Sequence, residues 1–483
     1  MPKTRKIFDV LDTQDEERIH NASVELLWDV GIKIMSREGK ELLLDNGCVD
    51  RGNGLIGIPW ELVDKAVSAN KPLTLYGQTP DKDIHLLRGD VYAHNFGATA
   101  AIIDIETGVK RAPTLEDQIN TFRILEKMDN MHMIGPLVSA TDVDPRLTQI
   151  VTVATAMQNS TKPFYLTVID AQQSRSVAKI INASNHKEAK RRGIIMVSPV
   201  SPLTFNEECF GAIKELASAG LCMISLPCPY LGITTPLALA AGVAQVSAEN
   251  LAFLVLAKLI NPDTPVVYGC RLGFANLHTC DYNDGKPEKG FLGAAAAQMA
   301  RRYNMASDVY GMATGASWSN DIQTGYDKAL GGLQAVFAGA DFMSGTGHLS
   351  HGAMTSYEQL VIDNEIVGMI LKVVEGISVT DETLAVDVIK DAMQSDEMIV
   401  THEHTVERLR SNDVFPGKLD NSLQYDKWVE LGKPSVYENA KNVVRQILSS
   451  PDDVPEDKNV TQAFNEVVKE LGCTFNGDLK VRT

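Results

Sequence analysis

From about residue 90 to residue 375, short apolar segments rich in β-forming residues alternate with segments whose apolar residues recur every three or four positions. The short segments predict buried strands, and the periodic segments predict amphipathic helices. Helix start signals follow the strands, for example at Thr114 and at Asp144-Pro145. Eight strands are expected in this part of the chain, at residues 91–97, 133–139, 164–169, 194–200, 221–228, 265–270, 307–313 and 341–347.

The expected strands are almost continuously apolar, which is typical of parallel strands that are buried on both faces. An open doubly wound sheet could also use many strand–helix units. Eight units without a Gly-x-Gly-x-x-Gly motif after the first strand favour a closed (β/α)8 TIM barrel over residues 90–375. We expect helical extensions at residues 1–89 and 376–483, with helices at residues 16–30, 38–45, 59–67, 382–393, 402–410, 435–448 and 460–471.

The chain has 483 residues and a net charge of −17, which disfavours nucleic acid and anionic membranes as partners. Its seven cysteines are an odd number with no Cys-x-x-Cys pair, so we expect reduced thiols and a cytoplasmic location. We also expect no signal peptide, because no apolar segment follows the first residues. The most apolar stretch, residues 233–260, contains Glu249 and Lys258, which favours a buried helix over a membrane span.

The loop at residues 344–352, after the eighth expected strand, is the most unusual segment of the chain. The reacting groups of TIM barrels come from the carboxyl ends of the strands, so this loop should open into the barrel mouth. Glycine lets a backbone approach a ligand closely, and histidine can donate, accept or titrate near neutral pH. We therefore expect a catalytic or cofactor-facing His348, cofactor contacts at Gly345 and Gly347, and a substrate contact at His351. The alternative is a glycine-rich turn that leads into a helix or binds phosphate.

Other candidate substrate contacts lie near the expected strand ends, and they are Asn95, Phe96, Tyr230, Arg271, Phe274 and Trp318. Several aromatic rings around a pocket can bind a quaternary ammonium group through cation–π attraction, although packing is the commoner role of any one ring. Arg271 could hold a substrate carboxylate or form a structural salt bridge.

Two further features have a structural alternative that is at least as strong. Cys270, His278 and Cys280 are zinc-binding residue types, but their spacing matches no strong zinc pattern, and we expect no metal site. Glu249 lies inside an apolar helix, where it is either a functional carboxylate or a hydrogen-bonded structural group.

Five stretches, taken together and in this order along the chain, resemble the trimethylamine methyltransferase superfamily. They are residues 201–203 (Ser-Pro-Leu), 248–251 (Ala-Glu-Asn-Leu), 323–330 (Gln-Thr-Gly-Tyr-Asp-Lys-Ala-Leu), 337–341 (Phe-Ala-Gly-Ala-Asp) and 355–366 (Thr-Ser-Tyr-Glu-Gln-Leu-Val-Ile-Asp-Asn-Glu-Ile). The archaeal founders of that superfamily carry pyrrolysine, and this chain has none, so it resembles the non-pyrrolysine branch.

The resemblance implies methyl transfer from a quaternary amine to the Co(I) of a corrinoid (cobalamin-type) cofactor carried by a separate protein. A quaternary amine needs no further activation, because its leaving group is a neutral tertiary amine. Glycine betaine, proline betaine or carnitine would be typical substrates, and no tightly bound cofactor is expected in this chain. Other hypotheses are a zinc-dependent methyltransferase that alkylates a thiol, a betaine-binding barrel without catalysis, and a phosphate-handling barrel. The long helical extensions also suggest a homo-oligomer.

Overall fold

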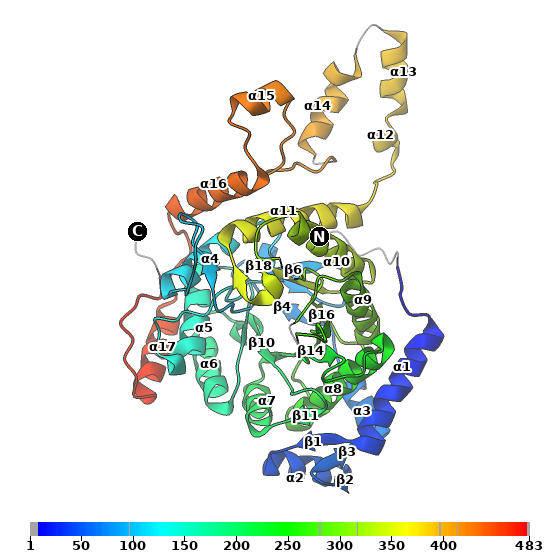
Figure 1. Ribbon diagram of the computed structural model, residues 1–483, viewed down its shortest axis with the longest axis vertical. Helices are drawn as coiled ribbons and strands as arrows, with labels where there is room; N and C mark the ends of the chain where they lie inside the picture. Colours follow the sequence, from blue (N-terminus) through cyan, green and yellow to red (C-terminus); the bar gives the residue numbers. More distant parts are fainter. Residues whose placement is uncertain are drawn as a thin grey trace.

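A parallel sheet of seven strands forms the centre of the computed structural model, which describes residues 8–95, 97–279, 282–315, 317–395, 398–411 and 413–480 (Figure 1). From β9 to β17, strands that follow one another along the chain are neighbours in the sheet, and the last strand, β17, pairs with the first, β6. In chain order the strands are β6 (Tyr92–Asn95), β9 (Phe164–Thr167), β10 (Gly193–Val197), β12 (Cys222–Ser225), β14 (Val266–Cys270), β16 (Ser307–Val309) and β17 (Phe342–Thr346).

The eighth position of the ring is filled by residues 132–139, which form single bridges rather than a regular strand. Met133 bridges to His94 of β6, and Ile134 bridges to Phe164 of β9. Pro136 cannot donate a ladder hydrogen bond, and the backbone N–H of Gly135 donates instead to the side chain of Asn95. The expected barrel is thus confirmed, but its second strand is irregular because proline and glycine interrupt the ladder.

The helices that follow the strands cover the outside of the barrel (Figure 1). They are α4 (Leu115–Glu126), α5 (Thr148–Asn159), α6 (Ala171–Ala183), α7 (Glu207–Ala219), α8 (Leu239–Ile260), α9 (Pro287–Arg302), α10 (Ile322–Phe337) and α11 (Tyr357–Glu375). Helix α8 is long and apolar enough to cross a membrane, but 83% of its most apolar window is buried within the protein. It is therefore a core helix, as its apolar pattern predicts.

The N-terminal extension contains the expected helices, a strand within residues 84–87 where the apolar segment Ile-His-Leu-Leu favours one, and a small sheet of β1, β2 and β3 that the sequence did not reveal. Its elements are α1 (Thr13–Glu25) with a π-helical turn at Leu26–Val30, β1 (Ile32–Ile34), α2 (Arg37–Asp45), β2 (Val49–Gly52), β3 (Leu55–Gly57), α3 (Trp60–Ser68), β4 (Thr74–Leu75) and β5 (Ile84–His85). Strand β1 pairs with β11 (Thr204–Phe205), which lies in the loop between β10 and α7. This pairing fastens the extension to the barrel.

The C-terminal part first leaves the barrel and then returns to it. Four helices project from the end of α11: α12 (Asp381–Leu384), α13 (Val386–Gln394), α14 (Glu403–Arg410) and α15 (Tyr425–Glu430) (Figure 1). Helix α16 (Val436–Ser449) then packs on α11, and α17 (Lys458–Glu470) packs on α5 and α6.

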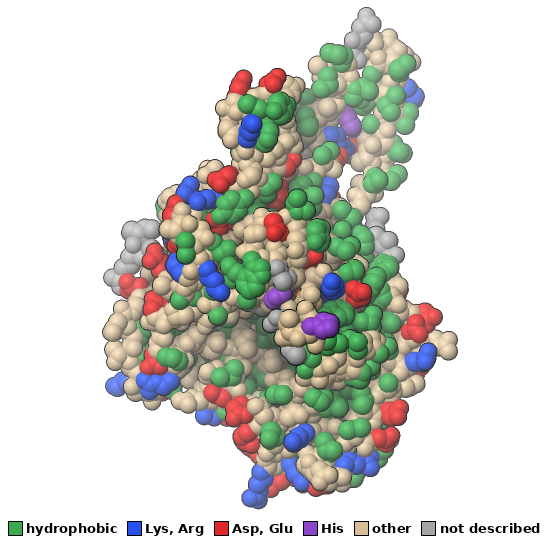
Figure 2. Space-filling view, in the orientation of Figure 1, with side chains coloured by type: hydrophobic (Ala, Val, Ile, Leu, Met, Phe, Trp, Pro, Cys, Tyr) green, Lys and Arg blue, Asp and Glu red, His purple; other side chains and the backbone are tan. Residues whose placement is uncertain are grey.

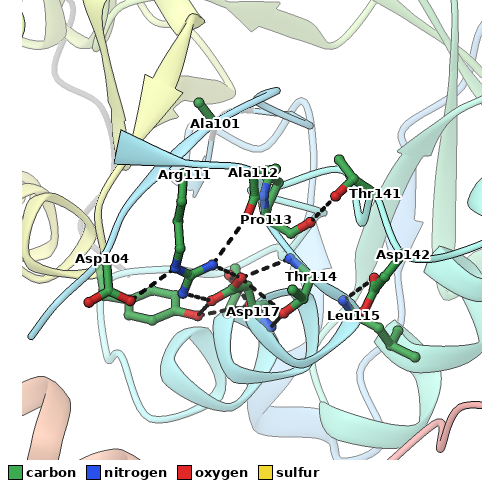
Figure 3. Close-up of polar contacts among 12 residues, drawn as sticks. Ala101, Asp104, Arg111, Ala112, Pro113, Thr114, Leu115, Asp117, Thr141 and Asp142 are labelled. Atoms are coloured by element: carbon green, nitrogen blue, oxygen red, sulfur yellow. Dashed lines mark hydrogen bonds and ion pairs between the residues drawn. The ribbon is translucent and has the colours of Figure 1, made fainter. Parts of the chain in front are cut away.

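The segments that follow β6 and β17 together form a second small sheet. It consists of β18 (His348–Leu349), β19 (Met354–Thr355), β7 (Ile102–Ile103) and β8 (Lys110–Arg111). Buried Asp117 joins β8 to the starts of α4 and α11, because its carboxylate accepts hydrogen bonds from the Arg111 guanidinium, the Thr114 N–H and the Tyr357 hydroxyl (Figure 3). Burial alone would raise the pKa of Asp117, but the hydrogen bonds from Arg111, Thr114 and Tyr357 outweigh it and lower that pKa.

Replacing Asp117 should destabilise the fold. We expect Asp117→Ala to lower the free energy of unfolding by about 3 kcal/mol, because it takes the carboxylate partner from Arg111 and from the Thr114 N–H and removes one half of the capping box of α4. Urea unfolding measures this effect. The loss should shrink below about pH 4, because a carboxylate with a lowered folded-state pKa contributes its stability only while it stays ionised.

The matched control is Glu106→Ala, which breaks the exposed ion pair between Glu106 and Arg445. Exposed pairs contribute little, so the urea midpoint of this variant should stay close to that of the wild type. Equal losses in the two variants would contradict our view of the Asp117 contacts.

Candidate active site

A cavity of about 280 Å³ lies at the carboxyl ends of the barrel strands, which is where TIM barrels place their reacting groups. It is lined by His94, Asn95, Gly97, Tyr165, Thr167, Met196, Leu226, Cys228, Tyr230, Arg271, Tyr282, Tyr310, Ser344, Gly345 and His351. A larger cavity of about 470 Å³ borders Val266 and Ala306 at the opposite ends of the strands. The face at that end serves stability rather than catalysis, so the smaller cavity is the candidate site.

Four tyrosine rings dominate the wall of this cavity. Tyr165 lies in β9, Tyr310 follows β16 directly, and Tyr282 lies in the loop before α9. Tyr230 begins the short strand β13 (Tyr230–Leu231), and its ring meets that of Tyr282 edge to face with 4.7 Å between the centroids. The wall is therefore rich in aromatic rings, and cationic groups of the protein already lie near one of them: Arg271 and Lys289 are 5.5 Å and 4.9 Å from the centroid of the Tyr310 ring.

The hydroxyl groups of Tyr165, Tyr282 and Tyr310 are hydrogen-bonded within the protein. The Tyr165 hydroxyl donates to the carbonyl of Asn95 at 2.6 Å, and that of Tyr282 lies 3.4 Å from the carbonyl of Arg271. Burial raises the pKa of Tyr165, Tyr282 and Tyr310 well above the usual range, so all three stay protonated. These rings are consequently neutral and fixed in place.

His348 lies behind Tyr310 and holds its hydroxyl. One ring nitrogen, Nδ1, contacts the carbonyl of Gly345, and the other, Nε2, lies 2.7 Å from the Tyr310 hydroxyl oxygen. A carbonyl only accepts, so Nδ1 carries the proton and Nε2 accepts from Tyr310. Burial and the nearby Lys328 charge lower the pKa of His348 well below its usual value, which keeps the imidazole neutral.

A fully buried ion pair fixes the loop that carries His348. Lys328 of α10 and Asp363 of α11 are each 0% exposed, and their charged groups are in direct contact. Asp363 also accepts the backbone N–H of Gly347 at 2.6 Å, while Lys328 donates to the carbonyl of Gly345. Gly345 has a φ of 111°, and a Cβ there would overlap the Tyr310 ring, so only glycine fits.

A second charged group borders the cavity but is already paired. Arg271 lies 3.1 Å from one carboxylate oxygen of buried Asp308, and His94 Nε2 lies 3.3 Å from the other. Burial alone would raise the pKa of Asp308, but Arg271 and His94 outweigh it and hold that pKa well below the usual range. The carboxylate of Asp308 therefore stays ionised beneath the cavity wall, in an ion pair with Arg271.

The residues singled out from the sequence divide into three groups in the structure. Five line the cavity: Asn95, Tyr230, Arg271, Gly345 and His351. A second group does not line the cavity. Gly347 and His348 lie behind its wall, and Phe274 packs against the core. The side chain of Trp318 is 58% exposed to solvent. Phe96 lies outside the described residues.

Three of the four cavity tyrosines, Tyr165, Tyr282 and Tyr310, were missed by sequence reasoning. Tyr165 and Tyr310 lie within segments that were expected to be strands, and alternation along a strand was the only available signal for an inward position. Tyr282 lies in an irregular loop, for which no periodicity exists.

The surroundings of the cysteines and of Glu249 favour structural roles over catalytic or metal-binding ones. Burial raises the pKa of Cys228, a cavity thiol, to about 11, so it is protonated at neutral pH. The described residues contain no group of three or more His, Cys, Asp or Glu side chains placed to hold a metal ion, and Cys280 lies outside them. Glu249 is absent from the cavity lining and accepts hydrogen bonds from Ser201, the Leu203 N–H and Gln245.

Residues 1–471 match the model of the family described as trimethylamine methyltransferase (MTTB). The chain is 31% identical to trimethylamine methyltransferase MttB of Desulfitobacterium hafniense (strain DSM 10664 / DCB-2), over 96% of this chain and 94% of the relative. It is 26% identical to the glycine betaine methyltransferase of Desulfitobacterium hafniense (strain Y51), over 88% of this chain and 89% of the relative.

A solved structure agrees at the level of the fold. The monomethylamine methyltransferase (MtmB) of Methanosarcina barkeri aligns over 98% of this chain and 91% of its own, with a TM-score of 0.53 and 12% sequence identity. At this identity the likeness shows a shared fold alone.

Removing one charge of the buried ion pair should destabilise the protein more than removing both. Lys328→Met leaves the Asp363 carboxylate buried without a counter-charge, and we expect the free energy of unfolding to fall by about 3–5 kcal/mol. The double variant Lys328→Met/Asp363→Asn removes both charges and should recover part of that loss. Urea unfolding of the two variants provides the measurement, and a double variant less stable than the single one would refute this account.

Proposed function

The chain belongs to the trimethylamine methyltransferase (MTTB) family and is a methyltransferase, and from this premise we propose that it moves a methyl group from a small quaternary amine to a corrinoid carried by a partner protein. The observation that carries the proposal is the cavity with four tyrosine rings at the carboxyl ends of the strands. Aromatic faces attract a quaternary ammonium group through their quadrupoles, and they displace water from its methyl groups.

The charges around the cavity suit a cation that must lose its charge during the reaction. No Asp or Glu is among the described residues of the lining, so ring faces rather than a carboxylate would hold the ammonium group. A methyl group leaves a quaternary nitrogen together with its positive charge, so a strong ion pair would stabilise the starting state and slow transfer. Tyrosine rings attract a cation less strongly than tryptophan does, which favours modest binding.

The leaving group also fits the side chains that are present. A quaternary amine departs as a neutral tertiary amine, so the site needs no acid to protonate it. The buried tyrosines stay protonated, and the Cys228 thiol has a pKa of about 11, so these groups are not poised for proton transfer at neutral pH. We infer that the enzyme acts mainly by orienting the substrate and excluding water.

His348 has a positioning role in this proposal. It holds the Tyr310 hydroxyl at 2.7 Å, and the Lys328–Asp363 pair holds the loop that carries His348. Arg271 already donates to Asp308 and to two backbone carbonyls, so it has little capacity left for a bidentate grip on a substrate carboxylate.

The exposed side chains around the open end of the barrel, which we call the rim, favour docking of a partner protein. A corrinoid in its reduced state supplies the nucleophile that accepts the methyl group, and it must approach from the open end of the barrel. Loops that follow successive strands expose large apolar side chains at this end, between 49% and 63% exposed, and they are Ile169, Val200, Ile233, Leu277 and Trp318. Exposed apolar residues gathered around one opening mark a surface that another protein covers.

Methyl transfer itself tests the proposal. Incubated with cob(I)alamin, the enzyme should demethylate at least one of glycine betaine, proline betaine or carnitine, and mass spectrometry of the demethylated amine provides the measurement. Tyr230→Leu should weaken binding of the accepted amine about 5- to 30-fold by calorimetry, because one cation–π contact is lost. Tyr230→Phe keeps the ring and serves as the matched control.

Two results would contradict the proposal. The first is binding of quaternary amines without any demethylated product, with cob(I)alamin and with corrinoid proteins alike, which would favour a binding protein. The second is demethylation of trimethylamine while every quaternary amine remains intact.

The rim generates a separate prediction about the partner. Ile169→Glu and Leu277→Glu should raise the KM for the corrinoid protein about tenfold or more, since a charge at an apolar interface is costly to bury. The Kd for the quaternary amine should not change, because neither side chain lines the cavity. Val49→Glu, at an exposed position of β2 in the N-terminal extension, is the control. An unchanged KM in both rim variants would show that the partner docks elsewhere.

A further inference from the structure

The segment formed by residues 376–435, which we call the arm, has almost no core of its own. Leu419 is its one buried residue among those that the structure describes. Its helices α12 to α15 contain four, nine, eight and six residues. Isolated helices shorter than about 12–15 residues are marginal in water, so helices of this length need packing against another surface.

The arm also exposes far more apolar surface than a monomer usually does. Sixteen large apolar side chains between residues 377 and 431 are at least 39% exposed, among them Ile377, Met393, Leu409 and Val414 at 75% or more. Figure 2 shows such side chains along the projecting arm. Their exposed area is on the order of 1,000 Å², above the roughly 300–600 Å² of the largest patch on a typical monomer and similar to the roughly 800 Å² that each partner contributes to a stable interface.

The same chain carries a second apolar surface, on the neighbouring helices α10 and α11. On α10, Ile322, Tyr326 and Leu330 are exposed at intervals of four residues, so they form one stripe along the helix. On α11, Met369 and Val373 are exposed at the same interval, and α10 packs against α11. We call this the α10–α11 surface, and nothing in the described chain covers it.

We infer that the arm of one copy of this chain packs onto the α10–α11 surface of a second copy, and that the second copy returns the same contact. One chain thus carries both halves of the interface, which is the condition for a self-complementary, twofold arrangement. A permanently associated copy would cover the arm at all times, as helices without their own core require. The inference is independent of the proposed methyl transfer, since neither surface lines the cavity.

The test uses charges of opposite sign on the two surfaces of the full-length chain. The arm variant is Met393→Asp/Leu409→Asp, and the α10–α11 variant is Met369→Lys/Val373→Lys. We expect the wild type to have the mass of two or more chains by light scattering, and each variant alone to have the mass of one chain. Mixed in equal amounts, the two variants should associate again, because the mixed pair has one contact between Asp and Lys and one unaltered contact.

Controls separate this result from misfolding and from other partners. Val49→Glu should keep the wild-type mass, and circular dichroism should show the same helical content in every variant. A monomeric wild type, an arm variant or α10–α11 variant that keeps the wild-type mass, or a mixture that stays monomeric would each overturn the inference. The last result would point to contact between two arms, because mixing restores no native arm–arm contact.

Discussion

The buried contact between Lys328 and Asp363 is the interaction on which the candidate site depends. Two charges with no exposure to solvent are stable only when hydrogen-bond partners surround them. Here Lys328 donates to the carbonyl of Gly345 near the end of β17, and Asp363 accepts the N–H of Gly347 just after that strand. That loop places His348 against the Tyr310 hydroxyl, and Tyr310 forms part of the cavity wall. The position of a cavity ring is therefore set by an ion pair that lies two contacts behind it.

The barrel was predictable because its signal is repeated. Each strand–helix unit shows the same change of period, so a weak unit is supported by its neighbours. The segment at residues 133–139 was recognised in this way, although Gly135 and Pro136 prevent a regular ladder there. The three strands β1, β2 and β3 were missed because they are only three or four residues long, and the pairing of β1 with β11 joins segments about 170 residues apart. Local patterns carry no information about such a pairing.

The site was predictable only in part, because strand ends can be located from the sequence but side-chain directions there cannot. Tyr230 and Trp318 both follow expected strands, yet one lines the cavity and the other is exposed. The glycine–histidine loop was found from its composition, and at Gly345 the glycine is required because a Cβ would overlap the Tyr310 ring. The structure also explains part of the family resemblance. Ser201 and the Leu203 N–H donate hydrogen bonds to the Glu249 carboxylate, so the stretches 201–203 and 248–251 contact each other in the fold.

The arrangement of Arg271, Asp308 and His94 extends the argument about charge. An ionised carboxylate close to a quaternary ammonium group would bind it tightly, but that attraction would vanish with the substrate's charge during methyl transfer and would raise the barrier. Asp308 is ionised near the cavity, and Arg271 and His94 each contact one of its oxygens. Arg271 thus balances the charge of Asp308, and the aromatic rings remain the main attraction for a cation. A site built to release a charge needs such neutralisation as much as it needs the rings.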